Sequence, residues 1–276
     1  MQYLRGLTGS ECNSIEDIMI SYDFQAGIYI EGYKGNTVQH NAFCTRLAQI
    51  ISTFDDCHSI LEVGVGEATK LGPLLSFLPK NSLKAFGFDI SWSRIKYAKK
   101  FLAELNIENI ELFIGDLFCT PLKNNSIDIV YTCHSIEPNG CREKEALIEL
   151  YRIANKYLIL LEPAYEFANE EARERMLFHN YVTNLYSTAI ELGYHVVEHR
   201  LFGINLNPLN PTGLIIIKKD NVSVNLDPLC CPVTKANLSF AGDAYFSEES
   251  LLAYPVVGGI PCLLPQNAII ATKFLD

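Results

Sequence analysis

The clearest sign of a chemical function is a stretch with two spaced glycines. The glycines follow a short apolar run and an acid. The run Ser59–Lys70 reads Ser-Ile-Leu-Glu-Val-Gly-Val-Gly-Glu-Ala-Thr-Lys. Its first half has the continuous apolar character of a buried parallel strand. Gly64 and Gly66 permit a tight turn and a close approach of the backbone to a ligand, and the amides that open a following helix can hold an anionic group. The stretch therefore predicts a binding turn for a nucleotide-like cofactor.

The residues around the glycines separate two classes of cofactor. The dinucleotide fingerprint requires a glycine or alanine three residues after the second glycine, where this chain has Thr69, so a nicotinamide dehydrogenase is disfavoured. Glu62 fits another pattern. The stretch resembles motif I of class I S-adenosylmethionine (SAM) methyltransferases, in which an acid precedes alternating glycines. Ala68 stands where that family often has a third glycine. A purely structural turn is the alternative, so the neighbouring segments decide.

Further segments follow in the order that this family shows. Asp89 closes the second predicted strand, and Asp116 follows the third. Pro121–Tyr131 is similar to the segment that leads into the family's fourth strand, and His134–Glu137 is similar to the "His-x-Leu-Glu" after it. The resemblance spans residues 20–220 and is most specific over 59–137.

The resemblance implies roles for these residues in binding SAM. Asp89 would accept hydrogen bonds from the two ribose hydroxyls, and Asp116 would bind the adenine amino group. Each has an alternative interpretation, Asp89 as a cap of the helix that begins after Ser91 and Asp116 as an ordinary loop residue. The residues expected to contact the cofactor are Tyr22, Glu62, Gly64, Val65, Gly66, Asp89, Ile90, Asp116, Leu117 and His134.

Methyl transfer from an activated sulfonium chiefly needs donor and acceptor to be positioned, and it needs a general base only where the acceptor loses a proton. The candidate catalytic residues follow the fourth and fifth strands and are His134, Glu137 and Tyr165. In this family the histidine segment is often structural, so a positioning role for His134 stays open. The segment Glu137-Pro138-Asn139 departs from the "Asn-Pro-Pro-Tyr" of enzymes that methylate nucleobases and glutamine, which disfavours those acceptors.

Strands that alternate with helices predict a doubly wound, Rossmann-like α/β fold with a seven-stranded, mostly parallel sheet. Ligands then gather at the carboxyl ends of the strands, where the residues above lie. We expect one long helix over 168–192, ended by Gly193, and an antiparallel pair of strands at one edge. The expected strands are 60–65, 83–90, 110–114, 127–133, 157–161, 195–202 and 214–218.

Changes of pattern divide the chain into three predicted parts. Residues 1–40 mix aromatic residues with turn formers and form an N-terminal arm, which either packs its tyrosines on the next domain or covers the cofactor as a lid. Residues 41–220 form the methyltransferase domain. Residues 221–276 are richer in proline and form a small C-terminal α+β domain.

The C-terminal part carries a resemblance of its own. It reads Cys-Pro-Val-Thr-Lys at 231–235 and Leu-Ala-Tyr-Pro at 252–255, followed by Gly-Ile-Pro at 259–261. The pattern is similar to a small zinc-ribbon-related family whose members activate tRNA and protein methyltransferases as separate subunits. A structural zinc needs four protein ligands. That family begins with Cys-x-x-Cys, but Thr234 stands where Cys231 should find its partner, so we expect a degenerate unit without metal.

Composition and charge limit the classes of acceptor and the cellular compartment that we expect. The chain has 276 residues, 49% hydrophobic and 20% charged, as in a globular protein with one large and one small domain. A net charge of −10 gives no electrostatic footprint for nucleic acid, so we expect a small-molecule acceptor rather than a nucleic acid. Nine cysteines, no export signal and no apolar run long enough for a membrane predict a cytoplasmic protein with reduced thiols.

Two functions from different classes are compatible with these patterns. The first is a SAM-dependent methyltransferase that acts on a small molecule or a saccharide by in-line transfer, with RNA or protein as alternative acceptors. The second is a catalytically idle scaffold on a SAM-binding fold, which binds a protein partner through its C-terminal domain. The intact set of acids and glycines around Gly64 favours retained SAM binding, but it does not establish turnover.

Overall fold

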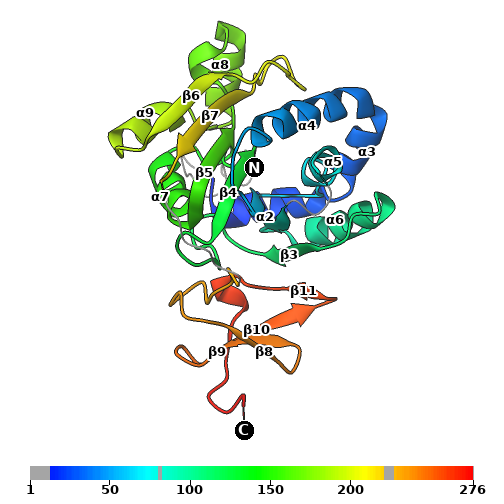
Figure 1. Cartoon of the computed structure of the whole chain (residues 1–276), viewed down its shortest axis with the longest axis vertical. Helices are drawn as coiled ribbons and strands as arrows, with labels where there is room; N and C mark the ends of the chain where they lie inside the picture. The colour runs from blue at the N-terminus through cyan, green and yellow to red at the C-terminus, as the bar shows by residue number, and fades with distance from the viewer. Residues whose placement is uncertain (1–12, 80–82, 221–226, 276) are drawn as a thin grey trace.

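The computed structural model describes residues 13–79, 83–220 and 227–275, which form a large α/β unit and a small β unit (Figure 1). The large unit contains a seven-stranded sheet of order β3-β2-β1-β4-β5-β7-β6. Neighbouring strands are parallel, except that β7 is antiparallel to both β5 and β6. The predicted doubly wound, mostly parallel sheet is therefore confirmed. Its strands are β1 (Ser59–Val63), β2 (Lys84–Asp89), β3 (Ile110–Ile114), β4 (Ile127–Cys133), β5 (Ala154–Leu161), β6 (Val196–Leu201) and β7 (Gly213–Lys218).

Helices cover both faces of this sheet (Figure 1). The adjacent Ile60 and Leu61 of β1 are fully buried in different cores, as the two-residue period of a strand requires. Within the described residues, no helix has the length and apolar character needed to cross a membrane. One face carries α4 (Thr37–Ile51), α5 (Leu71–Phe77) and α6 (Trp92–Glu104), and the other carries α7 (Glu143–Ile153) and α9 (Leu185–Glu191).

The small unit covers a part of the sheet that no helix of the large unit covers. Residues 115–126, which connect β3 to β4, contain no helix, so Phe86 and Phe113 on that face would otherwise meet water. Tyr254 and Leu263 of the small unit join the same buried cluster. A parallel sheet needs cover on both faces. Burial of each large apolar side chain contributes about 1.5–3 kcal/mol to stability. The small unit therefore stabilises the large one by completing its core.

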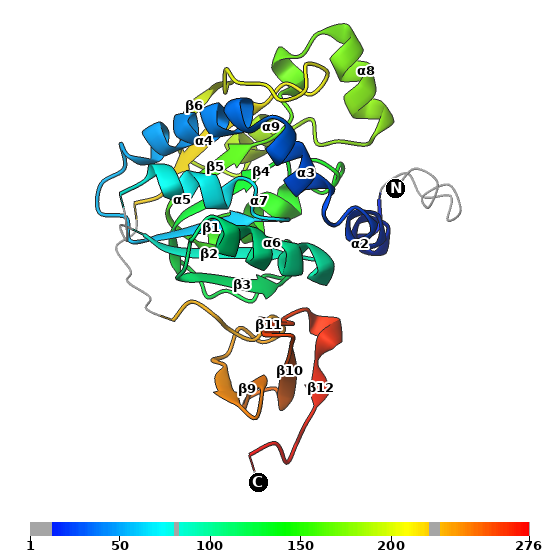
Figure 2. The same cartoon turned by 90° about the vertical axis from the view of Figure 1, so that its right-hand side faces the viewer.

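The small unit also closes the edge of the sheet at β3. The backbone amide of Leu263 donates to the Ile114 carbonyl at 3.0 Å, and Ile114 pairs in parallel with Cys262. The indole nitrogen of Trp92 on α6 donates to the Val257 carbonyl at 3.1 Å. Figure 2 shows the small unit directly beyond β3. The edge therefore exposes no free row of backbone groups at this point.

The small unit is an antiparallel sheet of order β11-β10-β9-β8, and β12 also pairs with β10. The sequence predicted an α+β unit here, but the helical part of residues 227–275 is only the 3-10 turn η2 (Pro265–Asn267). The strands are β8 (Ser239–Ala241), β9 (Ala244–Ser247), β10 (Leu252–Val257), β11 (Ile260–Pro261) and β12 (Ile269–Ile270).

The single long helix predicted over 168–192 is wrong, because an extended segment separates α8 (Glu170–Phe178) from α9. Asn180 has a left-handed φ of 56°, which ends the first helix. The amide of Val182 then donates to the Glu137 carbonyl at 3.0 Å, which holds the segment against the loop after β4. This tertiary contact overrides the helical period. Gly193 follows α9 with a φ of 75°, as expected after a helix C-terminus.

The described part of the N-terminal arm is helical and consists of α2 (Ile15–Phe24) and α3 (Ile28–Gly35). Ser14 and Asp17 form a capping box at the start of α2. Side chains of both helices face the same cavity as the carboxyl ends of the strands. This is the position that the lid interpretation of the arm requires.

Candidate active site

The carboxyl ends of the central strands and the N-terminal arm line one cavity of about 310 Å³. All residues predicted to bind the cofactor face it except Gly66, and of the predicted catalytic residues it includes His134 and Glu137 but not Tyr165. The predicted residues that line it are Tyr22, Glu62, Gly64, Val65, Asp89, Ile90, Asp116, Leu117, His134 and Glu137. That these side chains contact a cofactor or a substrate stays a prediction.

Tyr165 does not line this cavity. It belongs to the short helix η1 (Tyr165–Phe167) and packs beside Ala168 and Met176. The guanidinium carbon of Arg173 lies 5.4 Å from the centre of its ring. A catalytic role for Tyr165 stays a prediction.

The turn after β1 needs glycine at both positions. Gly64 has a φ of 66° and Gly66 a φ of 53°, left-handed conformations that side chains other than glycine rarely adopt. A Cβ on Gly64 would lie 2.4 Å from the Cβ of Ser135, and a Cβ on Gly66 would lie 2.5 Å from Nη2 of Arg94. The first glycine therefore lets the loop after β4 approach the turn, and the second accommodates a buried arginine.

Asp89 organises the turn before any ligand binds. Its Oδ2 accepts from the Gly66 amide at 3.0 Å, and its Oδ1 accepts from the Ser91 amide at 2.9 Å. Ser91 itself caps α6 through its hydroxyl, which accepts from the Arg94 amide. Asp89 thus takes part in the local structure before α6. Each carboxylate oxygen can accept a second hydrogen bond, so the residue can also hold a pair of hydroxyls in the cavity.

Burial determines the protonation of Glu62. Its side chain is almost completely buried, and the Tyr131 hydroxyl donates to Oε2 at 2.8 Å. Burial raises the pKa of Glu62 to about 8, although the bond from Tyr131 and the charge of Lys70 oppose the shift. At neutral pH the carboxyl therefore keeps its proton. A cationic group of a ligand would favour its ionised form.

The loop after β3 pairs a carboxyl group with an aromatic ring. Burial raises the pKa of Asp116, although its Oδ1 accepts from the Phe118 amide at 2.9 Å. Phe118 and Leu117 line the cavity beside it, and the guanidinium carbon of Arg142 lies 3.4 Å from the centre of the Phe118 ring. A carboxyl group next to a ring and an aliphatic side chain is suited to a planar nitrogen heterocycle.

Sequence reasoning missed how the arm is attached to the binding turn. Glu67, directly after Gly66, accepts from the backbone amides of Gly27 at 2.9 Å and Ile30 at 2.8 Å. Its carboxyl is thus the link between the cofactor turn and the start of α3. The only sequence signal for this role was an acid inside the glycine turn, because the partners are backbone groups of a distant segment.

A second link joins the arm to α6. The hydroxyls of Ser91 and Ser93 donate to Asp23 at 2.6 and 3.1 Å. Asp23 therefore caps the helix that follows Asp89 from outside. Together with Glu67, it ties both helices of the arm to the predicted cofactor-binding residues.

His134 is held between an acid and an alcohol. Its Nδ1 lies 2.6 Å from Glu137 Oε2, and its Nε2 lies 2.8 Å from Thr212 Oγ1. Asn210 donates to the same Glu137 oxygen at 2.9 Å. Burial opposes the charged imidazole, but the bond and the charge of Glu137 outweigh it and raise the pKa of His134. The left-handed φ of 54° at His134 is a strained conformation that often accompanies a functional site.

Glu162 fixes the loop that carries His134 and Glu137. Its Oε1 accepts from the amides of Ser135 and Ile136 at 3.1 and 3.2 Å, and its Oε2 accepts from the Glu137 amide at 3.0 Å. Burial raises the pKa of Glu162 to about 7. The residue therefore positions the loop through backbone contacts.

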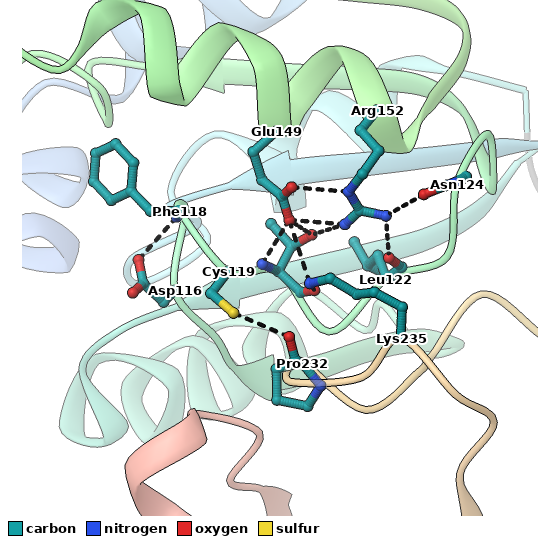
Figure 3. Close-up of polar contacts among 10 residues, drawn as sticks. Asp116, Phe118, Cys119, Leu122, Asn124, Glu149, Arg152, Pro232 and Lys235 are labelled. Carbon is teal, nitrogen blue, oxygen red and sulfur yellow. Dashed lines mark hydrogen bonds and ion pairs between the residues drawn. The ribbon is translucent and has the colours of Figure 1, made fainter. Parts of the chain in front are cut away.

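The small unit holds the loop that carries Asp116 (Figure 3). The thiol of Cys119 donates to the Pro232 carbonyl at 3.0 Å, and Lys235 Nζ donates to the Thr120 carbonyl at 2.8 Å. The backbone of the same loop pairs with the small unit through Leu122 and Leu229. One end of the cavity is thus built by a loop that the small unit supports.

A partly buried ionic cluster fixes the other side of this loop (Figure 3). Glu149 Oε1 accepts from the amide and the hydroxyl of Thr120 at 2.8 and 2.7 Å, and from Arg152 Nη2 at 2.7 Å. Lys235 of the small unit lies 3.7 Å from the same oxygen. Burial opposes ionisation, but these donors prevail and lower the pKa of Glu149. The charged carboxylate therefore links α7, the loop and the small unit.

Cys231 is the cysteine of the small unit that matches the Cys-x-x-Cys pattern of the resembled family. Cys231 is fully buried, with its Sγ 3.3 Å from the Tyr254 hydroxyl and 3.6 Å from the Ser250 hydroxyl. Burial disfavours the thiolate, but hydrogen bonds led by those from Thr234 lower the pKa of Cys231 to about 7. Among the residues that the structure describes, no three His, Cys, Asp or Glu side chains gather as a metal site. The absence of zinc stays a prediction.

Comparison with known proteins identifies the two units. Residues 60–156 match the family described as a methyltransferase domain. The fold is similar to that of magnesium protoporphyrin IX methyltransferase from Synechocystis PCC 6803 with bound SAH, with a TM-score of 0.58 and 12% identity over 74% of this chain and 100% of that one. The cyclase SpnF also shares it, with a TM-score of 0.51 and 12% identity over 64% of this chain and 81% of that one. These two similarities concern the fold alone.

The small unit has sequence relatives of its own. A UPF0434 protein from Rhodopseudomonas palustris is 49% identical over 45 residues, which are 16% of this chain and 69% of that protein. One from Brucella ovis is 40% identical over 55 residues, which are 19% of this chain and 86% of that protein.

The cavity fits the cofactor of the first family. Glu62, Asp89 and Asp116 end or follow three adjacent strands and face one cavity, so that acceptors are present for an ammonium, a diol and an adenine. The chain is therefore a SAM-dependent methyltransferase whose C-terminal unit belongs to the UPF0434 family.

Proposed function

We propose that this enzyme methylates a small-molecule or saccharide acceptor by in-line transfer. One observation carries the proposal: the predicted cofactor residues and the His134–Glu137 pair face the same cavity of about 310 Å³, which helices of the arm also line. A volume of this size lies at the lower end of the range of small-molecule sites. An RNA or protein acceptor would have to displace the arm, which Glu67 and Asp23 tie down.

The cavity also offers hydrogen-bonding amides and aromatic rings. Asn139, Asn207 and Asn210 line it together with Tyr22 and Tyr29. Amide side chains both donate and accept, and rings pack against apolar faces. These properties support an acceptor with several hydroxyl or amide groups, such as a saccharide.

His134 is our candidate for the general base. When bound, SAM supplies a methyl group activated by its sulfonium. Glu137 orients the imidazole through Nδ1, and Thr212 faces Nε2 from the cavity wall. A proton released by the acceptor would reach Nε2 through the Thr212 hydroxyl while the new bond to the methyl group forms and the bond from sulfur breaks. Glu137 then stabilises the resulting imidazolium.

Transfer of labelled methyl groups tests this function. Purified protein is incubated with methyl-labelled SAM and with small-molecule, protein and RNA fractions of a cell extract. We expect label in the small-molecule fraction. His134→Asn should transfer at least a hundredfold less label, because general-base catalysis contributes a factor of about 10²–10⁴ to the rate. The exposed control Lys144→Met should transfer as much label as the wild type. Label confined to protein or RNA would contradict the acceptor class, and an unchanged rate for His134→Asn would contradict the base.

For the C-terminal unit we propose the role of a built-in activator, because its resemblance is to subunits that activate methyltransferases. The contacts of Cys119 and Lys235 with the loop of Asp116 support this role, since they stabilise the predicted adenine end of the site. Lys235→Met should weaken SAH binding by roughly 3- to 10-fold, the value of one hydrogen bond. The control Lys273→Met changes an exposed lysine near the end of the same unit and should leave affinity unchanged. Equal affinities for wild type and Lys235→Met would contradict the role. Binding of a separate protein partner through this unit stays a prediction.

A further inference from the structure

Lys70 places a positive charge in the cavity without a carboxylate to neutralise it. It is half-buried and lines the cavity at the end of the binding turn. Its Nζ lies 2.9 Å from Nδ1 of His40 and 4.7 Å from the centre of the Phe43 ring. Within the described residues, no carboxylate oxygen lies within 4.0 Å of the Lys70 ammonium. A partly desolvated ammonium in such a position favours an anionic ligand.

His40 acts as a neutral partner and not as a second charge. Burial, followed by the charge of Lys70, lowers the pKa of His40 to about 4. Because the ammonium can only donate, Nδ1 must accept, and the ring proton is on Nε2. His40 lines the same cavity. The pair therefore provides ammonium and imidazole N–H donors with one net positive charge, which is the donor set that a carboxylate requires.

An acid in the same cavity has the opposite requirement. Glu62 lies close enough for the charge of Lys70 to affect its pKa, yet it remains protonated at neutral pH and does not cancel that charge. The same part of the cavity thus presents a carboxyl group that a cation would ionise and an ammonium that an anion would neutralise. An amino-acid zwitterion satisfies both groups at once, and the methionine end of SAM carries one ammonium and the cofactor's only carboxylate.

We infer that Lys70 and His40 form a carboxylate-binding subsite for the methionine end of the cofactor, opposite Glu62. The inference rests on SAM as the cofactor and extends it to residues that no motif singles out. Lys70 donates the charged hydrogen bond. His40 positions the ammonium and offers its own N–H. An anionic group on the acceptor has the same chemistry, so the test must separate the two sources.

Calorimetry with two nucleosides separates them in the absence of any acceptor. SAH carries the carboxylate, whereas 5′-methylthioadenosine has the same adenosine and thioether but no amino-acid end. Loss of a charged hydrogen bond should weaken SAH binding to Lys70→Met by about 10-fold or more. Binding of 5′-methylthioadenosine should change by less than about 2-fold, which also shows that the variant is folded. Lys70→Arg should recover part of the affinity, and His40→Ala should show a smaller loss than Lys70→Met, again for SAH alone.

Each alternative result has its own meaning. Equal SAH affinities of wild type and Lys70→Met would overturn the inference and leave the charge of Lys70 to the acceptor. An equal loss for both nucleosides would overturn it as well, because the effect would then not depend on the carboxylate. A wild-type protein that binds neither nucleoside would instead contradict the cofactor, and the inference with it.

Discussion

Binding of the cofactor should release a proton from Glu62. Burial holds the pKa of this carboxyl at about 8, so about 0.9 of the molecules carry the proton at pH 7. If Glu62 receives the ammonium of the cofactor, its ionised form is favoured in the complex. We therefore expect about 0.9 proton released for each SAH bound at pH 7.

The same shift makes affinity depend on pH. In the free protein the raised pKa of Glu62 stabilises the folded state at low pH, and this stability is lost as the pH rises from about 4.5 to about 8. Ligand binding has the opposite dependence, because it requires the ionised form. The association constant for SAH should rise by up to about tenfold per pH unit between pH 6 and 7.5.

Calorimetry in buffers with different ionisation enthalpies measures the released protons directly. Glu62→Gln keeps the size of the side chain and an oxygen for the Tyr131 hydroxyl, but it cannot ionise. The difference between wild type and this variant isolates Glu62 from other groups, such as His134. The same proton release in both proteins, or no release in wild type, would refute the reasoning.

Three further predictions concern single sites. Asp89→Ala should weaken SAH binding by about 2–4 kcal/mol, or roughly 30- to 900-fold, through two lost hydrogen bonds to a charged acceptor, and unchanged affinity by calorimetry would exclude the ribose role. Because Glu137 raises the pKa of His134 and a base must be unprotonated, kcat/KM for the acceptor, measured at saturating SAM so that Glu62 does not contribute, should rise with pH through a value above 6.5, and an acid limb that persists in His134→Gln would contradict this. Elemental analysis of protein purified without chelator should find no zinc, and one zinc per chain would show that Cys231 has ligands beyond Thr234.

The sequence predicts the parts of the site that depend on the ends of parallel strands. Glu62, Asp89 and Asp116 each end or follow an apolar run, and the topology of such a sheet brings those ends to one edge. The predicted strands and the caps of their helices therefore suffice to gather the acids around one cavity, as the structure has them. The cap alternative for Asp89 describes a real part of its role, since it binds the Ser91 amide.

Features set by distant contacts could not be predicted in this way. The period that suggested one helix over 168–192 is interrupted because the Val182 amide bonds to Glu137. Glu67 binds backbone amides of the arm, which leave no trace in side-chain patterns. Tyr165 was assigned from its place after the fifth strand, but that segment forms η1 and Tyr165 does not line the cavity. The C-terminal unit was expected to dock on the large domain, but the place where it docks had only a negative signal, the lack of a helix between the third and fourth strands.

Transfer of the labelled methyl group from SAM to a cell extract tests the central claim most directly. The account predicts transfer of label from SAM to the small-molecule fraction, with SAH formed in equal amount. This transfer should be lost in Asp89→Ala at limiting SAM. Saturable SAH binding by calorimetry without transfer to any fraction would contradict it and favour an idle scaffold on this fold.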